Sequence, residues 1–468
     1  MNALRIAIIG AGPAGIYAAD ILRKAEINSP VTIDIFEQLP APYGLVRYGV
    51  SPDHPRIKGI IGALKGILDS GQIRLFGNVR YGDDITIEDL KRHYHGVIFA
   101  TGAIRDQSLN ISGIEAEGSF GAADFVSWFD AHPDVPLDWP LEAESVAVVG
   151  NGNVALDVSR MLVKQPDDLV STEIPDNVLE GLRANNLKEL HLFGRRGPGA
   201  VKFTPLELRE LGEVRDVEIV LNEADFEIQD DHAEAQKQVN KQLIIIGRIF
   251  DAWRKAQRER ETDTSAAESR PASRKLYMHF WSKPVEVLST DGKVSGFRVE
   301  RTAPDGSGGV ISTGETRDVA VQAIYRAVGY LGSALDGVPF DENLGVINNV
   351  KGVVVDAAGE KMPGMFVTGW IKRGPVGLIG HTKSDAAETV AQIVENLDGL
   401  WSPSEPDEAS VSKMLVERGL PITTIDGWDR LDKHEMSLGE AQGRLRKKVQ
   451  SRSEMTKIAR LEEPGKSE

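Results

Sequence analysis

Short runs of apolar residues recur along the chain, and three of them lead into glycine-rich turns followed by an apolar pattern with helical spacing. The first run is Leu4–Ile9, the second is Val146–Val149, and the third is Met365–Val367. A short apolar run bounded by glycine is typical of a buried strand in a parallel sheet. Repeated strand–turn–helix units therefore predict an α/β protein.

The first turn, Gly10-Ala11-Gly12-Pro13-Ala14-Gly15, has the spacing of a dinucleotide-binding loop. Gly10 allows a sharp turn, Gly12 allows the backbone to approach a pyrophosphate, and Gly15 allows the helix to pack close to the strand. The next predicted strand ends at Glu37, whose carboxylate would accept hydrogen bonds from a ribose 2′-hydroxyl and repel a 2′-phosphate. This turn predicts FAD or NAD, and the alternative is a tight turn without a ligand.

The second turn, Gly150-Asn151-Gly152-Asn153-Val154-Ala155, repeats the pattern with alanine at its third small position. The next predicted strand, Glu189–Gly194, is followed by Arg195 and Arg196 rather than by an acid. Because guanidinium groups bind phosphate bidentately, this turn predicts NADP in preference to NAD. A solvated basic turn is the alternative.

Three titratable residues lie near these turns. A helix is expected after Thr204, and Glu207 and Glu210 lie one turn apart on it, on a face that is either in the nucleotide cleft or solvated. The proline- and glycine-rich stretch 38–56 predicts a fixed loop along the cofactor. His54 in this loop either handles protons or is simply bonded to the backbone.

The third turn follows Met365–Val367 and predicts a helix N-terminus at Gly377–Gly380. The positive end of that helix would face the negative charge that develops at N1–C2=O of a reduced flavin. Trp370 is expected beside the isoalloxazine, with a place in the core as the alternative.

Composition excludes several classes of function. The net charge of −16 argues against nucleic acid as a general partner, because counterion release needs a basic surface. The chain has no cysteine, which excludes disulfides, thiolate zinc sites, Cys-ligated iron–sulfur clusters and redox-active cysteine pairs within it. No metal site is expected. Neither a signal segment nor a membrane-spanning apolar run is evident, so a cytoplasmic location is expected.

Basic residues alternate with apolar ones over 237–260, which predicts one long amphipathic helix with a basic outer face. That face is either an ordinary charged surface or a docking surface for an acidic protein. The following strands, Leu276–Trp281, Pro284–Leu288 and Val294–Arg301, are expected to form an antiparallel meander.

With three glycine-rich turns in this order, the sequence resembles the adrenodoxin-reductase type of ferredoxin–NADP reductase. The resemblance runs from Leu4 to about Leu461 and rests on GAGPAGIYAAD, PYGLVRYGVSPDHP, GNGNVALDVSR, FGRRGP with FTPLELREL, and TGWIKRGPVGLIGHTKSDA. It implies two Rossmann-like, three-layer dinucleotide-binding domains. An NADP domain (105–327) would be inserted into an FAD domain made of 1–104 and 328–468, the last part carrying a C-terminal extension.

The turns and the resemblance together define the expected cofactor-binding residues. They are Gly10, Gly12, Pro13, Ala14, Gly15, Glu37, Gln38, Gly44, Leu45, Val79, Ala100, Thr101, Gly102, Gly369, Trp370, Gly377, Leu378 and Ile379 for FAD, and Asn151, Gly152, Asn153, Val154, Arg195, Arg196 and Glu207 for NADP, with Gly377 touching both. His54 and Glu210 match positions suspected of tuning hydride transfer or proton exchange. Arg209 and the basic helix 237–260 resemble the docking region for an acidic, ferredoxin-type iron–sulfur partner.

The resemblance implies that NADPH passes a hydride to FAD, which then releases single electrons to a ferredoxin. His54 and Glu210 are expected to modulate the rate rather than to be indispensable. A disulfide reductase shares the two-nucleotide plan but needs a cysteine pair, which this chain lacks. An NADPH-dependent flavin monooxygenase and a redox-silent flavin-binding interaction protein are the alternative functions.

Overall fold

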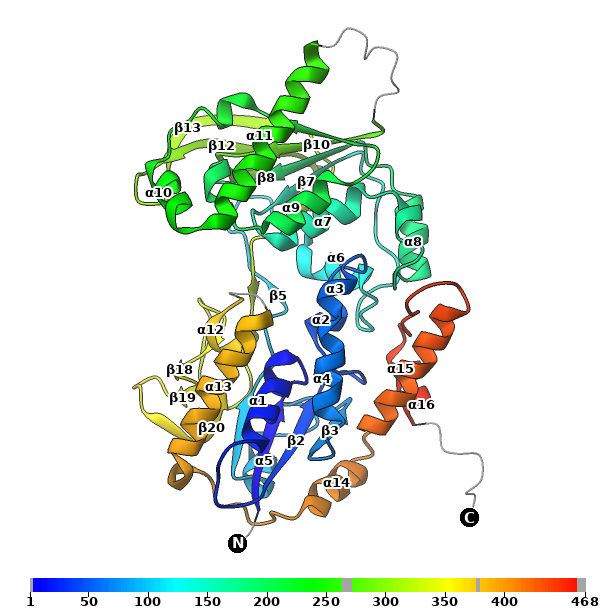
Figure 1. The fold of residues 1–468 in the computed structure, drawn as a ribbon, viewed down its shortest axis with the longest axis vertical. Coiled ribbons are helices and arrows are strands. Elements are labelled where there is room, and N and C mark those ends of the chain that lie inside the picture. The colour runs from blue at the N-terminus through cyan, green and yellow to red at the C-terminus, as the bar shows by residue number, and fades with distance from the viewer. Residues whose placement is uncertain (1–2, 263–271, 376–378, 461–468) are drawn as a thin grey trace.

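The computed structural model describes residues 3–262, 272–375 and 379–460, and in it the chain forms two lobes, each built on a β-sheet with flanking helices (Figure 1). The first lobe has a seven-stranded sheet in the order β18-β19-β20-β4-β1-β2-β3. Its strands are β1 (Leu4–Ile9), β2 (Val31–Glu37), β3 (Ile73–Gly77), β4 (Gly96–Phe99), β18 (Asn349–Val350), β19 (Val353–Val355) and β20 (Lys361–Val367). Strand β20 lies parallel to β4, so the two ends of the chain share one sheet.

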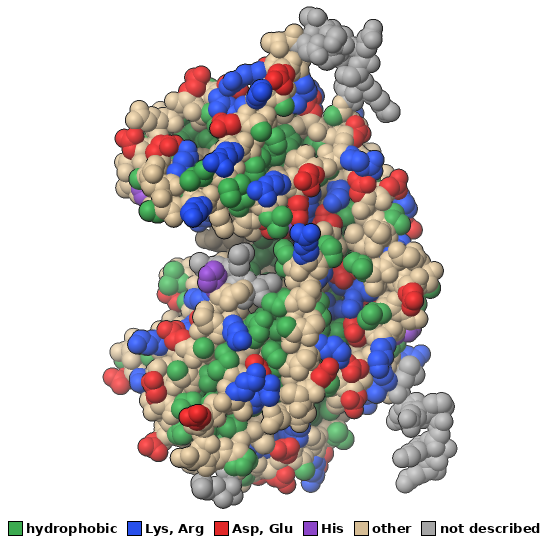
Figure 2. Space-filling view, viewed as in Figure 1, with side chains coloured by type: hydrophobic (Ala, Val, Ile, Leu, Met, Phe, Trp, Pro, Cys, Tyr) green, Lys and Arg blue, Asp and Glu red, His purple; other side chains and the backbone are tan. Residues whose placement is uncertain are grey.

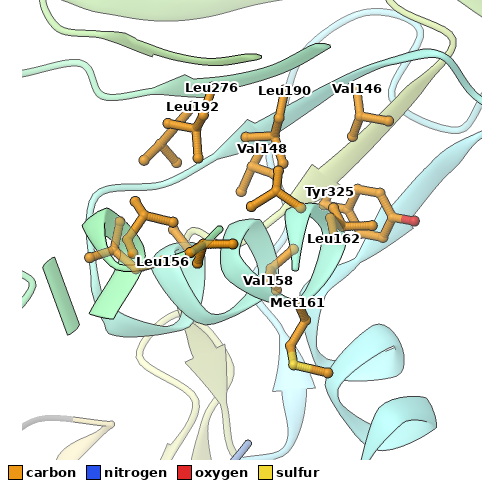
Figure 3. Packing of buried hydrophobic residues seen from close by; sticks show 14 of the residues in the cluster. Val146, Val148, Leu156, Val158, Met161, Leu162, Leu190, Leu192, Leu276 and Tyr325 are labelled. Carbon is orange, nitrogen blue, oxygen red and sulfur yellow. The ribbon is translucent and has the colours of Figure 1, made fainter. Parts of the chain in front are cut away.

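The second lobe has a six-stranded parallel sheet in the order β6-β14-β7-β8-β10-β9. Its strands are β6 (Ser119–Gly121), β7 (Ser145–Val149), β8 (Glu189–Phe193), β9 (Val217–Leu221), β10 (Arg274–His279) and β14 (Ala323–Arg326). Helix α7 (Asn153–Val163) packs against this sheet, and its Leu156 and Leu162 lie in one buried cluster with Val148 and Leu190, while Met161 points away from the sheet (Figure 3). The second lobe is thus inserted in the chain between β4 and β18.

The predicted antiparallel meander is wrong in its first strand. Residues 274–279 form β10, which pairs in parallel with β8 and β9. The antiparallel sheet consists instead of β11 (Ser282–Thr290), β12 (Lys293–Pro304) and β13 (Val310–Val319). The change of sheet occurs at Trp281, whose positive φ of 52° turns the chain out of the line of β10.

Two short strands connect the lobes. β5 (Arg105–Asp106) leaves the first lobe, and β15 (Tyr330–Leu331) returns to it, and they pair antiparallel. Figure 1 shows both passing through the waist of the molecule.

Helices cover both sheets. Helix α1 (Pro13–Arg23) packs against α13 (Ile379–Glu395), although they come from opposite ends of the chain (Figure 1). The other α-helices are α2 (Leu45–Tyr48), α3 (Pro55–Lys58), α4 (Ile60–Leu68), α5 (Ile87–His93), α6 (Ala122–Phe129), α8 (Asp176–Arg183), α9 (Pro205–Gly212), α10 (Asp231–Val239), α11 (Lys241–Thr262), α12 (Trp370–Arg373), α14 (Glu408–Glu417), α15 (Ile425–Glu440) and α16 (Arg452–Ala459). No helix in the described ranges is long and apolar enough to cross a membrane.

A buried charge cluster ties the C-terminal extension to both lobes; it consists of Lys58, Asp130, Glu173 and Lys448. The Lys448 ammonium lies 2.8 Å from Glu173 Oε1 and donates to the backbone oxygens of Arg47 (2.7 Å) and Asp130 (3.0 Å). Lys58 pairs with Asp130 and with Glu173. Burial lowers the pKa of Lys448 to about 8. The extension therefore adds a third, non-covalent connection between the lobes.

Candidate functional site

In the first glycine turn, Gly10 and Gly15 pack closely against other backbone atoms, whereas Gly12 borders open space. Gly10 has φ of +111°, and a Cβ there would lie 2.5 Å from the Ala100 oxygen. A Cβ on Gly15 would lie 2.1 Å from the Gly10 oxygen, which explains why the helix can start so close to the strand. At Gly12, by contrast, a Cβ would meet no described atom within 4 Å. Gly12 also caps α1 without a side-chain hydrogen bond, so the helix N-terminus can serve a phosphate.

Glu37 lies beside this turn, as the sequence predicts. Its carboxylate accepts hydrogen bonds from the backbone N–H of Ala11 (2.8 Å) and of Leu39 (3.1 Å). Burial raises the pKa of Glu37, against the lowering effect of these two bonds. Two bonds leave acceptor capacity on the carboxylate for ribose hydroxyls. The neighbouring Val79 is buried, and its N–H bonds to the Glu37 oxygen.

The remaining first-lobe candidates surround the same turn. Gly44 caps α2 with φ of +49°, and a Cβ there would lie 3.4 Å from the Gly12 Cα; Leu45 follows it as the first residue of α2. Gly369, with φ of +79°, abuts the Ala14 methyl group, so the turn that precedes α13 reaches the start of α1. Pro13 is the first residue of α1, Gln38 follows β2, Ala100, Thr101 and Gly102 follow β4, and Trp370 is half-buried at the start of α12. Gly377 and Leu378 lie outside the described residues, and Ile379 is the first residue of α13.

The second glycine turn has the same construction in the second lobe. Gly150 has φ of +155°, and a Cβ there would lie 2.2 Å from the Ala327 oxygen, whereas a Cβ on Gly152 would have no described atom within 4 Å. Asn151 packs against Gly194, and the Asn153 amide oxygen accepts from the Thr204 N–H (2.8 Å). Val154 lies in the first turn of α7.

Arg195 and Arg196 follow β8 beside this turn. The Arg195 side chain is exposed, and Arg196 is partly buried. Arg196 Nε is buried and has no hydrogen-bond partner among the residues that the structure describes. A buried guanidinium donor without a partner suits an anionic ligand such as a phosphate. Glu207 lies on α9 and accepts a hydrogen bond from the Thr204 hydroxyl, and burial raises its pKa.

His54 and Glu210 meet between the lobes. The His54 ring comes from the loop before α3, and its Nδ1 lies 3.2 Å from Glu210 Oε2 on α9. Its Nε2 lies 3.1 Å from Asp157 Oδ1 and 2.7 Å from Arg160 Nη2, both on α7. Burial alone would lower the pKa of His54, but the hydrogen bond to Asp157 brings the pKa above its ordinary value. The loop of one lobe thus presents a protonatable ring to two carboxylates of the other.

Comparison with known proteins finds relatives over nearly the whole chain. A sequence profile of the pyridine nucleotide-disulphide oxidoreductases matches residues 4–187. NADPH-ferredoxin reductase FprA of Mycobacterium tuberculosis is 38% identical over 473 residues, covering 98% of this chain and 99% of that protein. The mitochondrial NADPH:adrenodoxin oxidoreductase of Bos taurus is 35% identical over 464 residues, covering 97% and 92%. The solved structure of M. tuberculosis FprA in complex with NADPH superimposes with a TM-score of 0.88 at 37% identity, covering 98% and 100%.

The chain belongs to the adrenodoxin-reductase type of ferredoxin–NADP reductases. The expected fold class of two Rossmann-like domains, one inserted in the other, is confirmed.

Sequence reasoning missed four residues of this reductase's interlobe site, namely Asp53, Asp157, Arg160 and Lys164. Arg160 of α7 and Lys164, the residue that follows α7, both bind Asp53, the neighbour of His54, with Arg160 Nη2 2.8 Å from Asp53 Oδ1. Burial would raise the pKa of Asp53, but these two cations hold it well below its usual range. One feature of the sequence could have indicated them. The charged residues Asp157, Arg160 and Lys164 follow a nucleotide turn at intervals of three and four residues, which places them on one side of a helix.

The predicted basic helix over 237–260 is wrong as one helix. α10 ends at Val239 and α11 begins at Lys241, because Asn240 adopts an extended backbone conformation between them. Much of the basic charge is also paired: Arg254 and Arg258 both bind Glu223. Figure 2 shows blue side chains scattered over this part of the upper lobe among green apolar ones.

A groove of about 530 Å³ lies between α9 and α11. It is lined by Arg209, Gly212, Glu213, Ile245, Arg248, Ile249, Ala252 and Trp253. Arg209 and Arg248 have no ion-pair partner within the described parts of the chain. The groove therefore presents two unpaired arginines beside the acidic Glu213 and the apolar Ile245, Ile249 and Trp253.

Proposed function

We propose that this protein is an FAD-dependent ferredoxin–NADP(+) oxidoreductase that takes electrons from NADPH and delivers them singly to a ferredoxin-type iron–sulfur protein. One observation carries the proposal: two glycine turns lie on separate sheets, one beside an acid and the other beside an arginine pair, and the lobes meet at His54. The acid suits an unphosphorylated ribose, and the arginines suit a 2′-phosphate. The names of the relatives, which include NADPH with ferredoxin or adrenodoxin, support the same activity.

The candidate residues form two groups, one for each cofactor. The first turn, Glu37 and the start of α12 would hold FAD, which when bound converts a two-electron donor into a source of single electrons. The second turn, Arg195, Arg196 and Glu207 would hold NADP. Residues 1–104 and 328–468 would form the FAD domain, and 105–327 the NADP domain, in agreement with the β5 and β15 crossings.

At the interlobe site, the side chains orient the His54 loop and tune the protonation of its imidazole. The Asp53–Arg160 pair holds the His54 loop against α7, Asp157 favours the protonated imidazole, and Glu210 lies 3.2 Å from its Nδ1. Holding both nucleotides in one geometry contributes by proximity and by exclusion of water. We therefore assign His54 and Glu210 a modulating role.

An anaerobic titration tests the proposal. Addition of NADPH to the flavin-loaded protein is expected to bleach the flavin absorbance, and subsequent addition of oxidised ferredoxin is expected to restore it. Absence of bleaching would favour the redox-silent flavoprotein. Rapid reoxidation by oxygen with a small organic substrate, and none by ferredoxin, would favour the monooxygenase.

We further propose that the α9–α11 groove docks the iron–sulfur protein. Its two unpaired arginines would steer an acidic partner, and Trp253, Ile245 and Ile249 offer apolar contact area. The double charge reversal Arg209→Glu/Arg248→Glu is expected to raise the KM for ferredoxin at least roughly tenfold, as expected for two interface charges.

The reversal should leave NADPH–ferricyanide activity unchanged, since that small acceptor needs no docking surface. Lys255→Glu is the matched control, because Lys255 lies on α11 outside the groove. Equal effects of the two variants on the KM for ferredoxin would refute docking at this groove.

A further inference from the structure

The loop Gly194–Gly197, here called the arginine loop, is held from behind by the antiparallel sheet. The Gly194 oxygen accepts from the Ser282 N–H (2.9 Å), and the Arg196 oxygen accepts from the Trp281 N–H (3.1 Å). Between them, the Arg195 oxygen accepts from the Thr302 hydroxyl (2.8 Å). Three successive carbonyls of the loop are therefore bound by residues from the β10–β11 corner and β12.

Thr302 reaches the loop because β12 is irregular there. Phe297 and Val299 face the core, and simple alternation would turn Arg301 inward next. The β12–β13 register shifts between Glu300 and Thr302, and the inward position passes to Thr302, which is 1% exposed. A bulge that re-aims one side chain in this way commonly serves a nearby site. The Thr302 N–H also donates to the Trp281 oxygen (3.0 Å), which links both supports of the loop.

Trp281 closes the other side of the loop. Its indole is 1% exposed, and its Nε1–H donates to the Asp225 oxygen (3.0 Å). A Cβ on Gly197 would lie 2.1 Å from the Trp281 ring, so the glycine lets the loop rest directly on the indole. The end of the loop is thus seated on a rigid, buried surface.

We propose that Thr302 is a positioning residue for selection of the adenosine 2′-phosphate: its hydroxyl fixes the backbone of Arg195 so that the two guanidinium groups converge on the phosphate. The proposal rests on the proposed binding of NADP at this turn. Exposed arginines lose side-chain freedom when they bind, and a fixed backbone reduces the freedom that remains to be lost. Thr302 itself is buried behind the loop, so it would act on the nucleotide only through the loop.

Binding of two small probes tests this role without turnover. Adenosine 2′,5′-bisphosphate carries the 2′-phosphate, and adenosine 5′-monophosphate lacks it, so calorimetry on the flavin-loaded protein separates phosphate selection from general nucleotide binding. Thr302→Val removes the hydroxyl at nearly constant shape. It is expected to weaken binding of the bisphosphate roughly threefold to tenfold, the usual effect of one hydrogen bond, and to leave the monophosphate unchanged.

Two controls and a second variant sharpen the test. Thr302→Ser keeps the hydroxyl and should bind like the unmodified protein. Thr313→Val removes a similar hydroxyl-to-carbonyl bond, from Thr313 to the Arg301 oxygen (2.7 Å), on the exposed part of the same sheet, and should also have no effect. Gly197→Ala displaces the loop from Trp281 and should reproduce the selective loss, even if Thr302→Val does not fold.

Three results would overturn the proposal. Unchanged bisphosphate affinity in Thr302→Val, with preference for the bisphosphate intact, would remove Thr302 from the selection while leaving the proposed function standing. Equal weakening of both probes would show a general structural role. An unmodified protein that binds the two probes equally would contradict both this proposal and the NADP assignment.

Discussion

At the scale of single residues, His54 connects the two lobes through charge. It contacts Asp157 and Glu210 of the second lobe, while its neighbour Asp53 binds Arg160. The pKa of His54 is raised in the folded protein despite burial, because Asp157 favours the cationic ring. Its stabilising contribution is therefore complete below its unfolded value of 6.5 and is lost as the pH rises through the folded pKa.

Replacing His54 by Gln is expected to reduce that pH dependence. The unmodified protein should lose free energy of unfolding as the pH rises above about 6.5 and passes through the raised folded pKa of His54, and His54→Gln should lose less. Flavin reduction by NADPH should slow roughly tenfold or less, below the usual 10²–10⁴ contribution of an essential acid or base. Denaturant titration and anaerobic stopped-flow measurements check the two parts.

Complete loss of flavin reduction in His54→Gln, with FAD still bound, would contradict the modulating role. Parallel loss of stability with pH in both proteins would show that another group titrates.

The candidate residues that could be predicted from sequence are those whose role can be inferred from residues close to them in the sequence. Glu37, Arg195 and Arg196 each end a strand that follows a nucleotide turn, so local order was sufficient. Arg160 was missed because its partner, Asp53, lies on another lobe, and only the fold brings them together. Thr302 was missed for a related reason: its inward direction depends on a register shift that no alternation pattern contains.

At the scale of elements, the two glycine turns separate glycines required by the fold from glycines required by a ligand. Gly10 and Gly15 have backbone atoms within 2.5 Å of any added Cβ, whereas Gly12 has none described within 4 Å. Open space beside a backbone that caps a helix is what a pyrophosphate needs.

Gly12→Ala is therefore expected to leave the folding of the flavin-free protein almost unchanged and to weaken FAD binding strongly. Gly15→Ala should destabilise the flavin-free protein itself, by roughly 1–3 kcal/mol or more, because a methyl group would overlap the Gly10 oxygen. Thermal unfolding without flavin, followed by FAD titration, distinguishes the two. Equal melting temperatures of the two flavin-free variants would refute this division of roles.

Element boundaries show where sequence patterns fail. The strands that begin each nucleotide unit were predictable because their apolar runs are buried on both faces. The pattern of apolar residues over 237–260 keeps a helical period through Asn240, yet the helix is interrupted at that residue. The assignment of β10 to an antiparallel meander failed because a strand's partners depend on the sheet edge that is free, and not on its own residues.

At the scale of the whole molecule, the charge cluster of Lys58, Asp130, Glu173 and Lys448 joins both lobes and the C-terminal extension. Burial alone would raise the pKa of Glu173, but Lys448 and Lys58 hold it well below its usual value of 4.5. The contribution of Glu173 to the free energy of unfolding is therefore present above about pH 4.5 and is lost as the pH falls through its lowered pKa in the folded protein.

Glu173→Gln is expected to destabilise the protein by about 3–5 kcal/mol at neutral pH, because two buried ammonium groups lose a carboxylate. The difference should shrink as the pH falls toward the folded pKa of Glu173, where the native carboxyl is also neutral. Asp176→Asn is the matched control. Asp176 binds Arg444 and Lys447 but is 41% exposed, so its loss should cost about 1 kcal/mol or less. Equal costs for the two variants would contradict a special role for the buried cluster.

The insertion of one lobe within the other also dictates an order of events during synthesis. Strand β4 lacks its neighbour β20 until residue 367 has been made, by which time every strand of the inserted sheet has been translated. Because domains generally fold as units as they emerge, the inserted lobe can complete its core first. The N-terminal strands meanwhile expose the edge of β4 to other chains. Release of the chain before residue 367 would leave a folded second lobe attached to an unfinished, aggregation-prone first one.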